Sequence, residues 1–447
     1  MKNLNSSLSG SVVAAQGFLA SGVFCDLKRL GTGKGSDKGR KPDLALIVSE
    51  VPCTVAGLFT TNQVCAAPVK VCRPRVAAGV AQAVVVNSGN ANACTGRRGL
   101  VDAEAMAACA AGHLHLPTEH VLVASTGRIG VPLPMENMRE GIRRAAGRLG
   151  NAPEHAAEAA EAILTSDTHP KEVAVEFKVK GQRIRLGGMA KGAGMIQPGM
   201  SATGSRPAAG WHATMLAFLT SDAVIAAGPL QAALERAVAQ SFNRITVDGD
   251  MSTNDTVLLL ANGLAGNPAL TPGLPRRAGA NSGFEAFQAA LDFVCLELAK
   301  MIVRDGEGVT RLVTIRVSGA QTDADAEVAA LAVANSPLVK TSWCGGDPNW
   351  GRIMAALGYS RARVVEEKVD LGYSAPGGRQ VLWSLRRGQP TRATFRSLCA
   401  AVAAKEFDLH IRLNLGKGGA IRHAADLTEA YVDFNKGDVS DPKSLGG

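Results

Sequence analysis

The chain has 447 residues, of which 46% are hydrophobic and 19% are charged. This composition excludes an intrinsically disordered protein, and the length suits two or three domains or one large layered unit. The formal net charge is +9. Aromatic residues are not interleaved with the basic ones, which argues against a nucleic-acid surface, whereas a small anionic substrate suits the positive balance.

Two kinds of segment alternate along the chain: short β-branched runs closed by polar residues or glycine, and alanine-rich stretches. The first kind predicts strands at 44–49, 83–87, 120–125, 173–179, 182–186, 215–220, 256–261 and 312–317. The second predicts helices at 102–113, 154–164, 230–241, 284–303 and 323–335. Lys180-Gly181 predicts a hairpin turn, and 32–41, 201–212 and 265–283 are expected loops. Such alternation is typical of a layered α/β or α+β enzyme.

The nine cysteines are scattered, and the chain contains no Cys-x-x-Cys. An odd number without that spacing favours reduced thiols in the cytoplasm over a disulfide framework or a zinc site, so we expect no metal. No apolar run approaches the roughly 18 residues of a membrane span, and the N-terminus lacks a clear cleavage site. The sequence therefore predicts a soluble cytoplasmic protein.

Four polar, glycine-containing segments are candidates for chemistry, at 86–96, 124–130, 189–195 and 243–256. In the second, the Thr126 hydroxyl and the Gly127 amide could face one oxygen and form an oxyanion hole, although a plain turn is the alternative. In the third, Lys191 either holds a carboxylate or carbonyl, or is simply solvated. The fourth lacks the EF-hand spacing, which favours turn chemistry or a hydrogen-bond network over a calcium site.

A threonine hydroxyl within an apolar run carries a further possibility. If the bond between Ala213 and Thr214 breaks, the new α-amino group lies on the same residue as the hydroxyl, with an ordinary pKa of about 7.7–8.0. That amine can act as the base that activates its own side chain, as in enzymes with an N-terminal threonine nucleophile. The alternative is an ordinary buried strand that contains a threonine.

Eight segments, taken in order, resemble the glutamate N-acetyltransferase/ornithine acetyltransferase family of arginine biosynthesis. They lie at 57–62, 87–96, 125–127, 189–196, 213–223, 241–256, 304–308 and 347–352. The resemblance implies an α/β (α+β) fold similar to that of N-terminal-nucleophile hydrolases, an αββα-type sandwich of two central sheets covered by helices. It also implies a precursor that cuts itself into an alpha chain, 1–213, and a beta chain, 214–447. The two chains stay together and pair into an α2β2 heterotetramer.

The resemblance further implies roles for particular residues. Thr214 is the nucleophile and the first residue of the beta chain, the bond between Ala213 and Thr214 is cleaved, and Thr126 with Gly127 forms the oxyanion hole. For the substrate-binding threonine of segment 165–168 we choose Thr168, with Thr165 as the close alternative. The remaining substrate contacts are expected at Lys191, Thr214, Glu307, Asn435 and Ser440.

The implied reaction moves an acetyl group from N2-acetyl-L-ornithine to L-glutamate in two ping-pong steps through an acetyl-threonine ester. It needs neither metal nor cofactor, and no residue decides whether acetyl-CoA is also a co-substrate. Two alternatives stay open. One is an N-terminal-nucleophile amidohydrolase or aminopeptidase that passes the acyl group to water, and the other is an uncleaved, non-catalytic binding protein.

The chain departs from the family pattern in three places. Residues 201–212 form an insertion directly before the expected cleavage bond, and the insertion contains its own Ala202-Thr203. Ser440 replaces a threonine of the family, and residues 441–447 extend beyond the usual end. We place the cleavage before Thr214 because a strand-like apolar run follows only that threonine.

Overall fold

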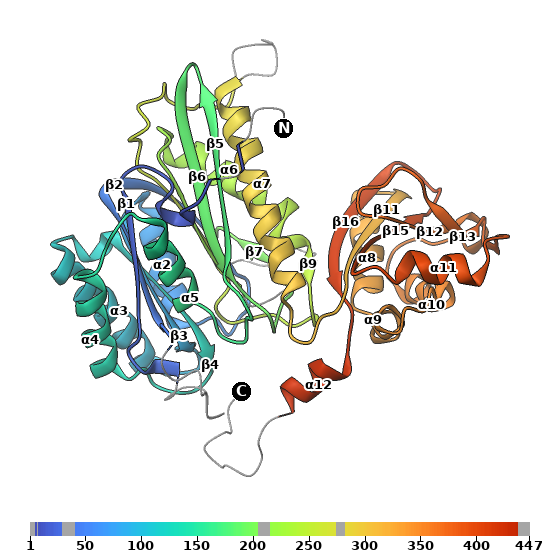
Figure 1. Ribbon diagram of the computed structural model, residues 1–447, viewed down its shortest axis with the longest axis horizontal. Coiled ribbons are helices and arrows are strands. Elements are labelled where there is room, and N and C mark those ends of the chain that lie inside the picture. The colour runs from blue at the N-terminus through green and yellow to red at the C-terminus, as the bar shows by residue number, and fades with distance from the viewer. Residues whose placement is uncertain (1–4, 7, 29–40, 204–214, 274–281, 437–447) are drawn as a thin grey trace.

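The computed structural model describes residues 5–6, 8–28, 41–203, 215–273 and 282–436. Figure 1 shows a larger lobe that contains the N-terminal half of the chain and a smaller lobe built from the segment after α7. Each lobe has its own β-sheet, and the two sheets contain nine and seven strands. Among the residues that the structure describes, no helix is both long and apolar enough to cross a membrane.

The nine-stranded sheet of the larger lobe has the order β4-β3-β2-β10-β8-β6-β5, with β1 and β7 also paired to β2. Its strands are β1 (Phe18–Val23), β2 (Leu44–Thr60), β3 (Val80–Asn90), β4 (Val121–Arg128), β5 (Lys171–Val179), β6 (Gln182–Lys191), β7 (Met200–Ser201), β8 (Leu216–Ser221) and β10 (Thr256–Ala261). The long strand β2 belongs to two halves of this sheet. Its first half pairs with β1 and β3, and its second half pairs with β10.

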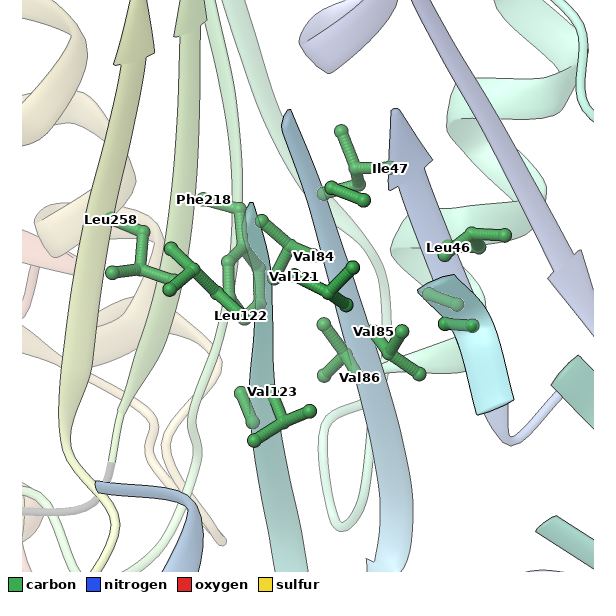
Figure 2. Close-up of a cluster of buried hydrophobic side chains, with 14 of the residues drawn as sticks. Leu46, Ile47, Val84, Val85, Val86, Val121, Leu122, Val123, Phe218 and Leu258 are labelled. Atoms are coloured by element: carbon green, nitrogen blue, oxygen red, sulfur yellow. The ribbon is translucent and has the colours of Figure 1, made fainter. Parts of the chain in front are cut away.

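The ladder between β2 and β3 is interrupted between Val48 and Cys53. Pro52 lies in that interval and has no backbone N–H to donate, so regular pairing cannot continue through it. Side chains of the two halves of the sheet pack against each other. Phe218 and Leu258, from the second half, lie in one buried cluster with Val84 and its neighbours in the first half (Figure 2).

Helices cover the outer faces of both halves. The residues that alternate with Phe218 and Leu258, namely Leu219 and Leu259, belong to a second cluster with the buried sides of α6 and α7. The helices of this lobe are α2 (Ala67–Ala77), α3 (Gly96–Leu114), α4 (Met135–Ala146), α5 (Pro153–Ala162), α6 (Ala227–Gln240) and α7 (Ser282–Arg304). The resulting layers are helix, sheet, sheet and helix, and the predicted two-sheet α/β class is confirmed.

The seven-stranded sheet of the smaller lobe has the order β14-β13-β12-β15-β11-β16-β9. Its strands are β9 (Ile245–Thr246), β11 (Leu312–Ala320), β12 (Asp370–Ser374), β13 (Leu382–Arg386), β14 (Gln389–Pro390), β15 (Glu406–Arg412) and β16 (Gly418–Ala425). Its helices are α8 (Asp323–Ala334), α9 (Pro337–Cys344), α10 (Trp350–Tyr359) and α11 (Phe395–Val402). The chain passes from the larger lobe to the smaller one between α7 and β11. In addition, β9 joins the smaller sheet from the larger lobe, and α12 (Glu429–Asn435) leaves the smaller lobe below it (Figure 1).

The strands and helices predicted from the sequence pattern are all confirmed by position. The predicted hairpin joins β5 and β6, and its turn residues Lys180 and Gly181 have φ values of 49° and 89°. Such positive values are those of a two-residue hairpin turn. Strands on both sides of the expected cleavage bond pair within one sheet, because β8 lies between β6 and β10.

Candidate active site

A cavity of about 220 Å³ lies where β4 and β6 end and where the chain enters β10 and leaves α7. The sequence-predicted residues Thr126, Gly127, Lys191, Glu307 and Asn435 all line it. They come from positions up to 309 residues apart in the chain, since Thr126 and Asn435 are the first and last of them. The sequence therefore named residues that only the tertiary fold brings together.

Thr126 and Gly127 form one wall of the cavity, at the end of β4. The backbone at Gly127 has a φ of 129°, which side-chain-bearing residues rarely adopt. A Cβ at Gly127 would lie 2.3 Å from the carbonyl carbon of Gly89 in the neighbouring strand β3. The close approach of two glycines thus lets β3 and β4 end side by side with their amides beside the cavity.

Asn254 fastens this wall to the segment before β10. Its side-chain nitrogen donates hydrogen bonds to the carbonyl oxygens of Ala91 and Ser125, both at 2.7 Å. Asn254 is 3% exposed, so these bonds are protected from water. The hydrogen-bond network expected in 243–256 is present, and it fixes the backbone next to Thr126.

Lys191, at the end of β6, is the buried cation of the site and is 2% exposed. Its Nζ donates hydrogen bonds to the Oγ1 atoms of Thr165, at 2.7 Å, and of Thr126, at 3.3 Å. An ammonium group can only donate, so both hydroxyls accept here and keep their own hydrogens for another acceptor. Burial lowers the pKa of Lys191, although the nearby carboxylate of Asp167 opposes the shift.

Glu307 and Asn435 form another part of the cavity wall. The Asn435 Nδ2 donates a hydrogen bond to Oε2 of Glu307 at 2.8 Å. The Glu307 amide donates to the carbonyl of Ala193 at 3.0 Å, and the Glu307 carboxylate lies over Gly194, where a Cβ would come within 2.4 Å of Oε1. The cavity lining therefore contains both the Lys191 cation and the Glu307 carboxylate, with hydroxyl groups beside the cation. That arrangement suits a small zwitterionic ligand.

The described residues contain no group of three or more His, Cys, Asp or Glu side chains that could hold a metal ion. The positive charge that faces the cavity comes from the Lys191 ammonium group.

Comparison with known proteins assigns the chain to a family. The model of the ArgJ family matches residues 29–437. The chain belongs to the ArgJ family.

Curated ArgJ relatives match nearly the whole chain. A protein from Symbiobacterium thermophilum, named arginine biosynthesis bifunctional protein ArgJ, is 47% identical over 428 residues, covering 96% of this chain and 98% of its own. The protein of the same name from Geobacter sulfurreducens is 44% identical over 420 residues, covering 94% and 98%. Among solved structures, ornithine acetyltransferase from Mycobacterium tuberculosis, complexed with ornithine, is 37% identical and covers 44% of this chain and all of its own, with a TM-score of 0.40. The predicted family and enzyme class, an acetyltransferase of arginine biosynthesis, are confirmed.

The structure distinguishes between the two threonines that we weighed in segment 165–168. Thr165 lines the cavity and accepts the hydrogen bond from Lys191. Thr168 is not among the cavity residues; its amide donates to Asp305 at 3.0 Å and its hydroxyl also donates to that carboxylate. This geometry favours Thr165 over our choice of Thr168, because the Thr168 hydroxyl is already engaged by Asp305.

Three predicted positions, Ala213, Thr214 and Ser440, lie outside the described residues. Met215, which directly follows Thr214 in the sequence, is fully buried at the head of β8. Its amide donates a hydrogen bond of 2.5 Å to Oδ1 of Asp255, and Leu216 pairs with Lys191 across the sheet. The head of β8 therefore lies beside the strand that carries the buried cation.

The sequence analysis assigned no role to Asp255, which lies within the segment 241–256 that resembles the family. It is 0% exposed, and its Oδ2 has no hydrogen-bond partner among the residues that the structure describes. Burial raises the pKa of Asp255 well above its usual value, against the effect of the Met215 amide. The signal that could have indicated it is the polar run from Ser252 to Asp255 immediately before a buried strand.

Proposed function

We propose that this ArgJ-family chain is a self-cleaving N-acetyltransferase that moves acetyl from N2-acetyl-L-ornithine to L-glutamate through an acetyl ester on Thr214. The observation that carries the proposal is the position of Met215. The residue directly after the expected nucleophile is held by Asp255 beside Lys191, and the oxyanion pair Thr126 and Gly127 lines the same cavity as Lys191. Nucleophile, oxyanion donors and carboxylate-binding cation are the parts that acyl transfer between amino acids needs.

Self-cleavage begins with attack of the Thr214 hydroxyl on the carbonyl carbon of Ala213. The peptide C–N bond breaks, the acyl group moves to the Thr214 oxygen, and the released nitrogen takes up the hydroxyl proton. Water then hydrolyses the ester, leaving a carboxylate on Ala213 and a free α-amine on Thr214. Strands β6 and β8 lie on opposite sides of this bond in the sequence and pair in the sheet, so the two chains stay associated.

Acetyl transfer uses the new α-amine as the base. It takes the proton of the Thr214 hydroxyl as the oxygen attacks the acetyl carbonyl of acetylornithine, and the oxyanion is held by the Thr126 hydroxyl and the Gly127 amide. The proton then passes to the nitrogen of ornithine as the C–N bond breaks, and an acetyl-threonine ester remains. The amine of glutamate attacks the carbonyl carbon of that ester and loses a proton to the Thr214 α-amine. The ester C–O bond then breaks, the Thr214 oxygen takes the proton back from the α-amine, and N-acetylglutamate leaves.

Lys191 and Glu307 bind different charged groups of the substrate. Lys191 neutralises the α-carboxylate that ornithine and glutamate share, and Glu307 pairs with the δ-ammonium of ornithine. The proposed steps use neither a metal nor a cofactor. Since the relatives are named bifunctional, we also propose acetyl-CoA as a second acetyl donor. We further propose an α2β2 assembly of the cleaved chains and action in the cytoplasm.

The decisive experiment compares wild type with Thr214→Ala and with Thr203→Ala, which alters the other Ala-Thr pair before β8. We expect two chains on a denaturing gel from wild type and Thr203→Ala, with the second chain starting at Thr214. Thr214→Ala is expected to give one full-length band and no transfer from acetylornithine to glutamate. Two chains from Thr214→Ala, or an intact but fully active wild type, would refute the mechanism. Acetate release without glutamate would instead indicate an amidohydrolase.

A further inference from the structure

Four alternating charges are buried behind the cavity, and we call Asp305, Lys171, Asp167 and Lys191 the ion chain. The Lys171 Nζ donates to Oδ2 of Asp305 at 2.5 Å and to Oδ1 of Asp167 at 2.7 Å. The other carboxylate oxygen of Asp167 lies 3.8 Å from the Nζ of Lys191. The exposed fractions of the four side chains are 2%, 0%, 0% and 3%.

The ion chain is balanced in charge and well supplied with hydrogen bonds. Asp167 also accepts from the amides of Gly192, at 2.6 Å, and Thr165, at 3.0 Å. Although burial by itself opposes ionisation, the ammonium groups of Lys191 and Lys171 hold the pKa of Asp167 well below its usual range. A buried ionic cluster is weak support for stability, because apolar side chains of equal volume often stabilise a core equally well. We therefore ask whether the ion chain contributes to the substrate specificity of the cavity instead.

Three members of the ion chain line the cavity or lie within two residues of a residue that does, and Lys171 connects two of them. Asp305 is two residues before Glu307, on the turn that follows α7, and Asp167 is two residues after Thr165. Lys191 lines the cavity itself. The ion chain therefore links the wall that carries the carboxylate of Glu307 to the wall that carries the buried cation.

We propose that Asp305, Lys171 and Asp167 are positioning residues that fix the separation between Lys191 and Glu307, and thereby select the length of the amino-acid side chain that the site accepts. The proposal rests on the function given above, in which Lys191 binds the α-carboxylate and Glu307 the terminal ammonium. A substrate whose side chain is one methylene longer then fits poorly. A single methylene in an enzyme pocket commonly changes the specificity constant by about 10- to 200-fold.

The test measures kcat and KM for N2-acetyl-L-ornithine and for N2-acetyl-L-lysine, which has one more methylene. Asp305→Asn keeps the shape of the side chain but removes its charge from Lys171. We expect wild type to prefer acetylornithine by about 10- to 200-fold, and Asp305→Asn to lower that preference at least about tenfold, mainly through KM. Asp408→Asn is the matched control, because Asp408 is also 2% exposed and pairs with Arg316 at 2.6 Å in the smaller lobe.

A purely structural role would make both substrates slower in proportion and leave the preference unchanged, and that result would overturn the proposal. Should Asp305→Asn fail to fold, Thr168→Val provides the second variant, because Thr168 is exposed and donates its hydroxyl to Asp305. We expect this variant to lower the preference for acetylornithine about three- to tenfold. An unchanged preference would again refute the proposed role of the ion chain in substrate selection. A wild type that transfers no acetyl group would instead refute the proposed function.

Discussion

Substitution of Gly127 by alanine tests the geometry of the proposed oxyanion hole most directly. Two separate costs arise in the structure. The φ of 129° at Gly127 is unfavourable for alanine, at about 1–3 kcal/mol. The new Cβ would also lie 2.3 Å from the carbonyl carbon of Gly89 and 2.6 Å from the amide nitrogen of Asn90.

Both close neighbours of that Cβ are backbone atoms of β3, which cannot rotate away as a side chain would. An ordinary contact begins near 3.4 Å, so β3 and β4 must separate by about 1 Å, and forced overpacking of this kind costs about 1–3 kcal/mol. The sum is about 2–6 kcal/mol, a large part of the 5–15 kcal/mol that stabilises a typical protein. A displacement of that size also moves the Gly127 amide, and the loss of one oxyanion donor lowers kcat by about 10²–10³.

Gly130→Ala is the control for Gly127→Ala. Gly130 has a φ of 83°, but a Cβ there would meet nothing within 4 Å. We expect the control to lose about 1 kcal/mol and to keep kcat within a few-fold, because it carries only the backbone strain. Urea unfolding and the acetylornithine–glutamate transfer assay give the two quantities. If Gly127→Ala were as stable and as active as Gly130→Ala, the close approach of β3 and β4 would not shape the site.

Two further predictions concern buried titrating groups. Burial lowers the pKa of Lys191, so its positive charge is lost at a lower pH than for an exposed lysine. KM for acetylornithine is therefore expected to rise as the pH increases through that pKa. Lys191→Met should raise KM about 10- to 100-fold at neutral pH and remove the pH dependence, whereas a parallel pH profile in the variant would contradict the role of Lys191. Burial raises the pKa of Asp255, so between its unfolded and folded pKa values the folded state holds more protons and stability falls as the pH rises. Asp255→Asn should flatten that fall, measured as the urea midpoint from about pH 5 to about pH 8, and equal slopes would exclude an ionising Asp255 as its cause.

Local sequence patterns were sufficient where a short segment determines its own structure. The hairpin between β5 and β6 was predicted from Lys180-Gly181, because few residues other than glycine adopt a positive φ without cost. Helix α7 was predicted at 284–303, before the polar, glycine-containing segment 305–308, and its apolar residues form a buried side against β5. The polar segment with Thr126 and Gly127 was predicted at a strand end because it interrupts a buried apolar run.

Local sequence patterns did not predict which residues far apart in the chain form the site. Nothing in the local sequence of Glu307 or Asn435 indicates a site, and both were expected only from the resemblance to a family. The sequence also left Thr165 and Thr168 as alternatives, since both are hydroxyl residues in one short loop. The structure separates them, because Lys191 bonds to Thr165 and Asp305 engages Thr168.

The sequence by itself indicated the strands and helices named in the sequence analysis, the hairpin turn and, through its ordered motifs, the family, because each of these patterns lies within a few neighbouring residues. The tertiary structure decided which polar groups meet. Folding of the sheet at β2 lets β8 and β10 pack on β3 and β4, and the return of α12 to the larger lobe brings Asn435 to Glu307. Those meetings depend on packing and buried charge pairs across hundreds of residues, and no local pattern carries that information.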